Sequence, residues 1–161
     1  MILYKIAGVC AILTSGLIVY IESQKYENKK LNQLDAYITL IDYIKNQVEC
    51  FLLPIDEIIC KCDILLLNRC GITEGIEKVK TIEDIVEASE LYIDQDALSL
   101  IDKFAKEYGR AYRAEQVRSC VFYKEELLKI YNNNKKSNDE QKKVRLAISL
   151  CVSFSIILIL I

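Results

Sequence analysis

Two apolar runs at opposite ends of the chain frame a more polar middle segment. The first run extends from Ile6 to Ile21 and the second from Leu146 to Ile161, 16 residues each. At a rise of about 1.5 Å per residue, a helix of this length spans about 24 Å and approaches the roughly 30 Å hydrocarbon core of a bilayer. In the second run only the serines are polar, so the polar face of a core helix is missing. The pattern predicts two transmembrane anchors, at residues 1–21 and 144–161.

The charged residues beside these runs predict the orientation of the chain. Lys5 lies before the first run, and the other flanking basic residues are Lys25, Lys29, Lys30 and the cluster from Lys135 to Arg145. Because basic residues favour the cytoplasmic side, we expect a cell-membrane protein whose residues 22–143 lie in the cytoplasm. The same cluster predicts contact with anionic membrane lipid.

A cleaved signal peptide is the alternative interpretation of the first run. The residues from Val19 to Glu22 include none of the small side chains that a signal peptidase requires. We therefore favour an uncleaved anchor.

Small residues recur at every fourth position in both apolar runs. Such stripes allow helix backbones to approach closely in lipid, although chance also produces many of them. The predicted packing residues are Ala7, Ala11 and Ser15 in the first run and Ala147, Cys151 and Ser155 in the second.

The middle of the chain begins with two predicted helices. Apolar residues recur at threes and fours from Leu34 to Leu52, which predicts one amphipathic helix of about 20 residues that ends before Pro54. The second helix starts at Pro54 and ends near Gly71. Its inward positions are Ile55, Ile58, Ile59, Cys62 and Leu66.

Three further helices are predicted after Gly71. Thr81 and Asp84 form a capping signal for a short helix that extends to about Leu91. The next helix begins at Asp96 and is ended or bent by Gly109, with inward Leu98, Ile101, Phe104, Ala105 and Tyr108. The last runs from about Ala111 to Tyr131, with inward Val117, Cys120, Val121, Leu127 and Leu128.

Residues 132–143 contain no apolar side chain and form either a solvated linker or a polar helical extension. No run alternates between apolar and polar residues long enough to indicate a strand. The predicted fold class is therefore all-α, an antiparallel helical bundle between two transmembrane helices.

Composition narrows the possible functions. Histidine is absent, which removes the commonest general base near neutral pH and the commonest metal ligand. The net charge of −2 gives no reason to expect a nucleic-acid partner. The sequence has no glycine-rich phosphate loop and no serine-centred elbow. We therefore expect neither an enzyme nor a small-molecule substrate, and no cofactor.

The chain contains seven cysteines, two of them inside the apolar runs. An odd set is atypical of a disulfide-bonded exported domain, so we expect reduced thiols that pack as small apolar groups. The alternative is a metal site of Cys60, Cys62 and Cys70 with Cys50, in a membrane metal or redox sensor. Zinc-binding pairs are normally two to four residues apart, whereas one residue separates Cys60 from Cys62.

Two segments, FLLPIDEII and FAKEYGRAYRAEQVRSCVFYKEEL, together with the two predicted anchors, resemble the stage III sporulation protein AB family of endospore-forming bacteria. The resemblance covers the full length. Gly109 and Gln116 match a glycine and a glutamine of the family at the same separation. Tyr108 and Tyr112 depart from it, since the family often has leucine before the glycine and an acidic residue shortly after it.

The resemblance implies a subunit of the channel complex that links mother cell and forespore. The family's cytoplasmic domain is similar to a cytoplasmic repeat of the F component, the platform protein of type II secretion. This similarity implies docking to a secretion-type ATPase, the stage III sporulation protein AA, and to other membrane subunits of the same operon. The implied location is the outer forespore membrane, on its mother-cell side. A platform subunit of an ordinary type II secretion or pilus system is the alternative.

The sequence also offers candidate contacts for such partners. They are Arg110, Arg113 and Arg118 and the acidic segment Glu83–Glu90, each of which has an ordinary solvated surface as its alternative. Gln116 is a candidate to donate its amide to a free carbonyl at the helix end that Gly109 closes, and an ordinary exposed glutamine is the alternative.

Overall fold

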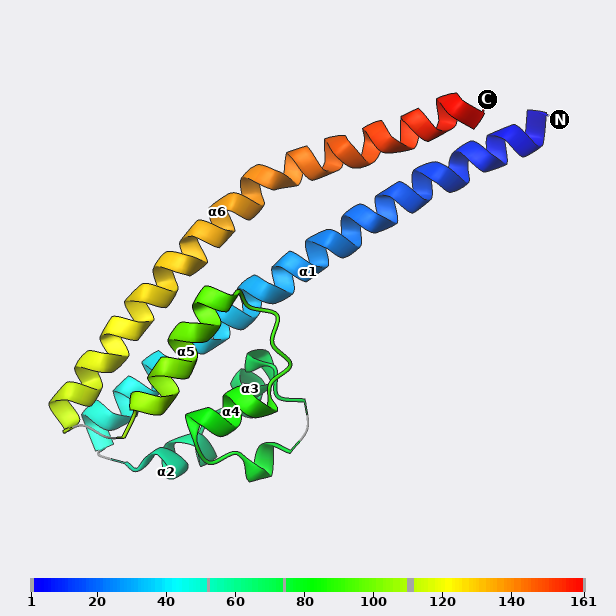
Figure 1. Ribbon diagram of the computed structural model, residues 1–161. Helices are drawn as coiled ribbons and strands as arrows, with labels where there is room; N and C mark the ends of the chain where they lie inside the picture. Colours follow the sequence, from blue (N-terminus) through cyan, green and yellow to red (C-terminus); the bar gives the residue numbers. More distant parts are fainter. Residues whose placement is uncertain (1, 52, 74, 110–111, 161) are drawn as a thin grey trace. The chain divides into compact units, whose positions relative to one another are not determined.

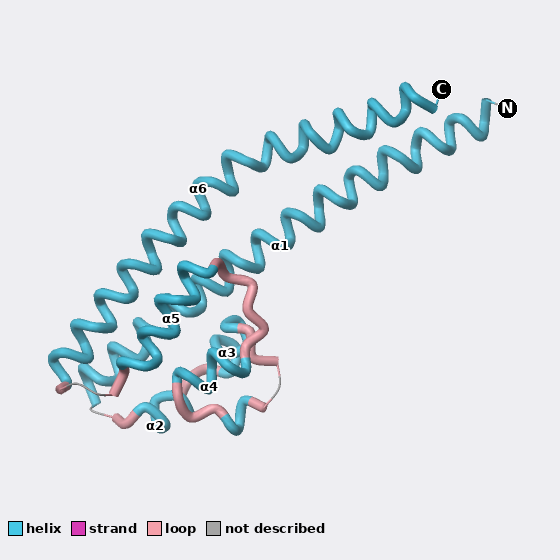
Figure 2. The backbone as a smooth tube through the Cα atoms, viewed as in Figure 1, coloured by secondary structure: helices cyan, strands magenta, loops and turns pink. Residues whose placement is uncertain are grey.

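The fold is described by a computed structural model, which covers residues 2–51, 53–73, 75–109 and 112–160, and for residues 2–7, 10, 159 and 160 describes the backbone alone. Within these ranges the chain is helical and carries no strand (Figures 1 and 2). The helices are α1 (Ile2–Phe51), α2 (Ile55–Cys60), α3 (Ile64–Cys70), η1 (Ile76–Lys78, 3-10), α4 (Ile82–Ala88), α5 (Gln95–Glu107) and α6 (Arg113–Leu160). The predicted all-α class is confirmed.

The chain divides into two compact units. One, which we call the body, comprises Lys29–Asn133, and the other, the terminal unit, comprises residues 1–28 together with 134–161. Helices α1 and α6 contribute to both units. The segments between each apolar run and the body are helical, so residues 132–143 form the predicted helical extension and not a loop.

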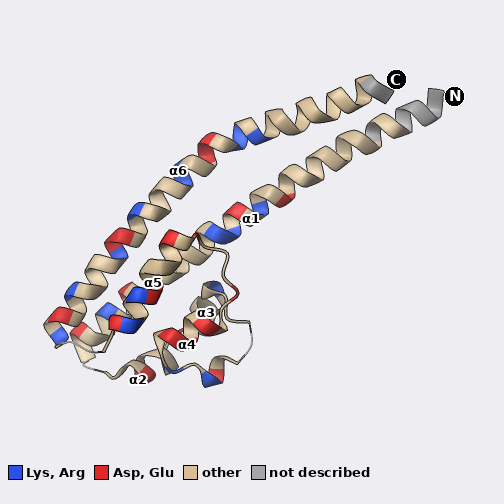
Figure 3. Cartoon of the chain, viewed as in Figure 1, with Lys and Arg blue, Asp and Glu red and all other residues tan. Residues whose placement is uncertain are grey.

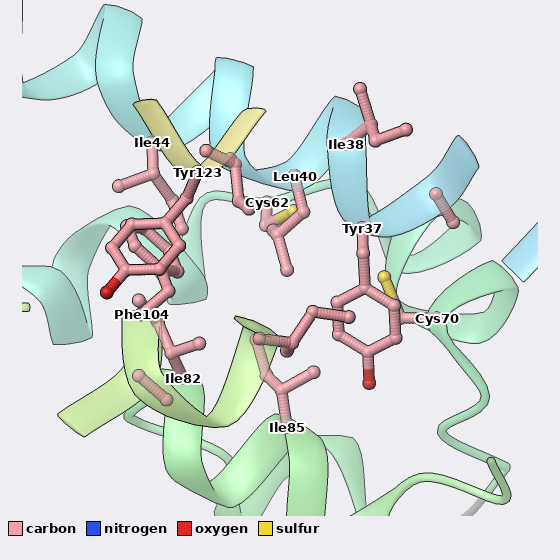
Figure 4. Close-up of a cluster of buried hydrophobic side chains, with 14 of the residues drawn as sticks. Tyr37, Ile38, Leu40, Ile44, Cys62, Cys70, Ile82, Ile85, Phe104 and Tyr123 are labelled. Carbon is pink, nitrogen blue, oxygen red and sulfur yellow. The ribbon is translucent and has the colours of Figure 1, made fainter. Parts of the chain in front are cut away.

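The body is built around one apolar core to which all of its α-helices contribute (Figure 4). Buried residues include Tyr37 and Ile44 of α1, Ile58 of α2, Leu67 of α3, Ile85 of α4, Phe104 of α5 and Leu127 of α6. The ring of Phe104 lies 5.4 Å from that of Tyr123 and 5.6 Å from that of Tyr108, centroid to centroid. Such tilted aromatic pairs add about 0.5–1.5 kcal/mol each beyond the burial of their area.

The segment 55–70 is two helices, where the sequence predicted one. Helix α2 ends at Cys60, and Asp63 starts α3 by accepting a hydrogen bond from the backbone N–H of Leu65 at 2.9 Å. A side chain that satisfies a free N–H at a helix start offsets the cost of the break. The predicted end at Gly71 is confirmed, with φ of +111°.

The capping signal at Thr81 is confirmed. The hydroxyl of Thr81 accepts from the N–H of Asp84 at 3.1 Å, and the carboxylate of Asp84 accepts from the N–H of Thr81 at 2.8 Å. Helix α4 then stops at Ala88, three residues before the predicted end. The next segment leaves the helix because Ile72 and Ser89 form an isolated antiparallel bridge.

The last helices of the body confirm most of the predicted inward residues and correct two. Helix α5 ends before Gly109, whose φ is +83°. Ala97, and not Leu98, is the fully buried residue of the first turn. In α6, Val121 is 38% exposed whereas Tyr123 is 5% exposed. Tyr123 reaches the core because its hydroxyl remains satisfied at the edge, where it donates to Glu107 at 2.6 Å.

Candidate functional site

The apolar ends of α1 and α6 pack against each other through small residues. The hydroxyl of Ser149 donates to the backbone carbonyl of Gly16 at 2.7 Å, and Ser153 is 4% exposed. A β-carbon on Gly16 would collide with the Ser153 hydroxyl oxygen, so a larger residue at this position would require that hydroxyl to move. Small residues at a helix contact are typical of packing in lipid.

The predicted stripe lies on a different face from this contact. Ala11, Ser15, Ala147, Cys151 and Ser155 are exposed, and the side chain of Ala7 lies outside the described residues. On α6 the contact follows Ser149, Ser153 and Ile157, which have the same four-residue spacing but lie on a different face. The predicted stripe therefore does not form this contact, and its role in packing against another membrane helix stays a prediction.

Large apolar side chains cover the outside of the terminal unit. Those exposed by more than half include Ile18, Val19, Val144, Ile148, Val152, Phe154 and Leu158. Extended apolar surface of this kind marks a contact with lipid or with another protein. No helix within the described residues is both long and apolar enough to cross a membrane.

An apolar groove of about 410 Å³ opens between the two helices of the terminal unit. Apolar side chains form most of its wall, among them Val19, Ile148, Val152 and Ile156. Tyr20, Ser23 and Arg145 line it as well. The groove falls in the range of roughly 300–1,000 Å³ that is typical of ligand sites.

Arg145 joins the two helices at the polar side of this groove. Its Nη2 atom donates to Glu27 at 3.2 Å and to Gln141 at 2.9 Å. Its Nη1 atom is buried and has no hydrogen-bond partner, and the same is true of the Nε2 atom of Gln24. Buried donors without acceptors are unusual in native proteins, where the great majority are satisfied. Of these two residues, Arg145 lines the groove and Gln24 does not.

The charges of the chain are unevenly distributed (Figure 3). The terminal unit contains seven basic and four acidic residues, a net charge of +3, although the whole chain carries −2. The predicted basic cluster Lys135–Arg145 lies in this unit. Figure 3 shows the far ends of α1 and α6 without charges over their described residues.

The arginines predicted to contact a partner differ in their surroundings. Arg110 lies outside the described residues. Arg113 donates to the backbone carbonyl of Glu49, one of the last carbonyls of α1, and so helps to close that helix. Arg118 is exposed on α6 and forms no ion pair in the described part of the chain.

Gln116 and Gly109 have local roles at the ends of their helices. The N–H of Gln116 bonds to the carbonyl of Tyr112 at 2.9 Å as part of the first turn of α6. Gly109 provides the positive φ that α5 needs to end. In the acidic segment, Asp84 is engaged in its capping box, whereas Glu83, Glu87 and Glu90 are exposed.

The cysteines divide into buried and exposed thiols. Cys62, Cys70 and Cys120 are buried, and Cys50, Cys60 and Cys151 are exposed and unpaired. Burial raises the pKa of Cys70 to about 12, and those of Cys62 and Cys120 to about 11. A raised thiol pKa makes a poor nucleophile and metal ligand. Among the described residues no three of His, Cys, Asp or Glu form a group that could hold a metal ion.

The most connected polar residue in the body is Gln33, which no sequence pattern had singled out. It is 3% exposed, donates to the carbonyls of Cys70 and Glu90, both at 2.7 Å, and accepts from the N–H of Tyr92 at 2.7 Å. A cavity of about 270 Å³ adjoins it, but Arg69 on its wall is paired with Asp35 at 2.6 Å. We interpret Gln33 as structural, because its amide satisfies backbone groups that the loops leave free.

No family model, curated protein or solved structure matches this chain. The fold and the surface together define the class of this protein. It is a helical protein with an all-helical body and an apolar terminal unit in which α1 packs against α6.

Proposed function

We propose that the chain is a membrane-anchored scaffold subunit. Its two apolar runs would cross the membrane side by side and hold the body at the cytoplasmic face. The observation that carries this proposal is the pairing of α1 with α6 through Gly16 and Ser149 beneath a coat of exposed large apolar side chains. In water that coat would be costly, since burying such a side chain is worth about 1.5–3 kcal/mol.

The orientation rests on charge. Along the sequence, the basic residues that flank the two apolar runs lie between the runs, except for Lys5, which precedes the first run. The positive-inside tendency supports a cytoplasmic location for the body. A helical domain held at both ends loses less orientational freedom when it binds a partner, which suits a scaffold.

We further propose that the scaffold serves the channel between mother cell and forespore, in the outer forespore membrane. There it would dock a secretion-type ATPase, the stage III sporulation protein AA, and other membrane subunits of the same operon. The support is the resemblance carried by FLLPIDEII, Gly109 and Gln116, together with the all-helical body. Candidate docking residues are Arg118 and the exposed carboxylates Glu83, Glu87 and Glu90.

Two measurements test this function. The full chain, expressed in a bacterial membrane, should resist extraction by alkaline carbonate, and protease added outside sealed cells should leave the body intact. Detergent-solubilised full chain should retain the ATPase on an affinity column. Extraction by carbonate would contradict the anchors, whereas a membrane-bound chain that fails to retain the ATPase would contradict the docking role alone.

A further inference from the structure

We propose that the groove between α1 and α6 binds one anionic phospholipid, with an acyl chain along Val152 and Ile156 and the phosphate at Arg145. The inference rests on the proposed membrane anchoring and adds a specific site to it. Four features carry it: the length of the groove, its apolar wall, the polar side chains at one side and the net charge of the terminal unit.

The length of the groove matches one leaflet of a bilayer. From Arg145 to Ile156 the helix advances 11 residues, about 16 Å at a rise of about 1.5 Å per residue. Half of a hydrocarbon core that is roughly 30 Å thick is about 15 Å. A partner transmembrane helix would need an apolar face along the whole thickness, whereas a single acyl chain needs one leaflet. The dimensions therefore favour a lipid over a helix.

The wall suits an acyl chain. Apolar side chains dominate the lining, with Val19 of α1 and Ile148, Val152 and Ile156 of α6 along the groove. No charged side chain other than Arg145 lines it within the described residues. A flexible hydrocarbon chain fills such a groove without leaving a polar group unpaired.

The polar side suits a phosphate. The Nη2 atom of Arg145 is engaged by Glu27 and Gln141, which fixes the orientation of the guanidinium, and its Nη1 atom remains buried without an acceptor. A guanidinium presents its N–H groups in a planar fork that matches phosphate oxygens. The hydroxyls of Ser23 and Tyr20 line the same groove and can donate to the phosphate or to the glycerol ester oxygens.

Charge favours an anionic headgroup over a zwitterionic one. Glu27 offsets the charge of Arg145, but the terminal unit as a whole carries +3. Lys142 and Lys143 lie within one turn of Arg145 on α6. These basic residues attract anions at the membrane surface, where the headgroups lie.

The test measures lipid retention by the full chain. Purified in detergent and reconstituted in nanodiscs of phosphatidylcholine with a minor fraction of phosphatidylglycerol, the protein is released and the co-purified lipid is counted by native mass spectrometry. We expect one retained phosphatidylglycerol per chain, which an excess of inorganic phosphate does not displace. Displacement by inorganic phosphate, or equal retention of phosphatidylcholine, would overturn the proposal.

Two variants separate headgroup from groove. Arg145→Gln should lower the preference for phosphatidylglycerol by about tenfold or more, as expected for loss of a charged hydrogen-bonded contact. Its matched control is Lys25→Gln, which removes the same charge from an exposed side chain of the terminal unit that does not line the groove. Val152→Phe should block retention by filling the groove, with Leu150→Phe, outside the lining, as its control. Equal losses in variant and control would contradict a specific site.

Membrane insertion of the same chain is measured separately, by carbonate extraction of the bacterial membranes before detergent is added. A wild-type chain that inserts and retains no anionic lipid contradicts the lipid site and leaves the anchors standing. A wild-type chain that carbonate extracts contradicts both.

Discussion

The side-chain amide of Gln33 lies so close to Gly71 that a β-carbon at position 71 would come within 2.5 Å of its Nε2 atom. The same β-carbon would also lie 2.7 Å from the backbone oxygen of Glu90. Position 71 therefore needs glycine for two reasons: its φ of +111° is unfavourable for other residues, and there is no space for a β-carbon. Both follow from the hydrogen bonds by which Gln33 of α1 holds the backbone at Cys70 and Glu90.

Gly71→Ala should therefore destabilise the body by at least about 2 kcal/mol, measured as a loss of helical circular dichroism with temperature on the full chain in detergent. Gly75 has a φ of +75°, and a β-carbon added there would have nothing within 4 Å, so Gly75→Ala isolates the conformational part. A Gly71→Ala penalty no larger than that of Gly75→Ala would show that the space beside Gln33 adjusts freely.

Gln33→Ala should destabilise the protein by at least about 3 kcal/mol. The substitution leaves the carbonyls of Cys70 and Glu90 and the N–H of Tyr92 without their partner, and each unsatisfied buried group costs about 1–3 kcal/mol. Asn32→Ala, at the exposed neighbouring position, should stay within about 0.5 kcal/mol in the same thermal unfolding experiment. Similar effects at both positions would contradict the central role of Gln33.

The capping box of α4 predicts a loss of stability in acid. Hydrogen bonds from the backbone N–H groups of Lys80 and Thr81 hold the pKa of Asp84 below its usual value. A group whose folded pKa is lowered contributes stability above its unfolded pKa, near 4, and this contribution is lost as the pH falls through the folded pKa. Asp84→Asn should flatten the dependence of the unfolding temperature on pH between about 5 and 2. Glu87→Gln, at an exposed position outside the box, should leave that dependence unchanged.

The buried thiols predict a loss of stability in alkali. Burial raises the pKa of Cys70 to about 12, whereas an unfolded cysteine titrates near 8.5. Above about pH 8.5 the unfolded chain binds fewer protons than the folded one, so stability falls as the pH rises toward 12, by at most about 1.4 kcal/mol per pH unit for each such thiol. Cys70→Ala should reduce this slope, and Cys60→Ala, at an exposed thiol, should not. Equal slopes would show that Cys70 is not protected from titration.

Charges placed on the apolar coat test the anchors. Ile18→Arg combined with Leu150→Arg should shift the chain toward the carbonate-soluble fraction, because an arginine inside an apolar membrane helix is costly, by up to about 2.5–3.5 kcal/mol at the helix centre. Both positions are exposed, at 59% and 41%, so the pairing of α1 with α6 should survive. Phe122→Arg, at a body residue exposed by 54%, is the matched control and should remain membrane-bound.

The docking surface is best tested at Arg118. Arg118→Glu should weaken binding of the secretion-type ATPase by about tenfold if a charged contact is lost, as measured by affinity capture in detergent. Arg113→Glu is a poor substitute, since Arg113 also holds the carbonyl of Glu49 and its loss would loosen the end of α1. Lys61→Glu, exposed just after α2, is the control, and an equal effect there would indicate general repulsion of the ATPase.

The sequence predicted those features that depend on neighbours along the chain. The helix periodicity, the Thr81 capping box and the ends at Gly71 and Gly109 all follow from local chemistry, and the structure confirms them. Prediction failed where tertiary contacts decide. The break at Asp63 and the burial of Tyr123 in place of Val121 depend on which residues of other helices pack against these segments.

The candidate site shows the same division. The sequence showed four-residue repeats of small side chains on more than one face of α6. It did not show which face packs against α1, because the contact between Ser149 and Gly16 joins residues 133 positions apart. Gln33 carried no signal, because its three partners lie 37 to 59 residues away and are backbone atoms, which every residue possesses.

Asn138 has one more consequence for the terminal unit. It is 3% exposed, and both polar atoms of its side chain lack a hydrogen-bond partner. Each such atom costs about 1–3 kcal/mol, so local opening is least costly in this polar stretch of α6. We therefore expect amide hydrogens around Asn138 to exchange faster than those around Leu127, and the chain to melt in two cooperative steps.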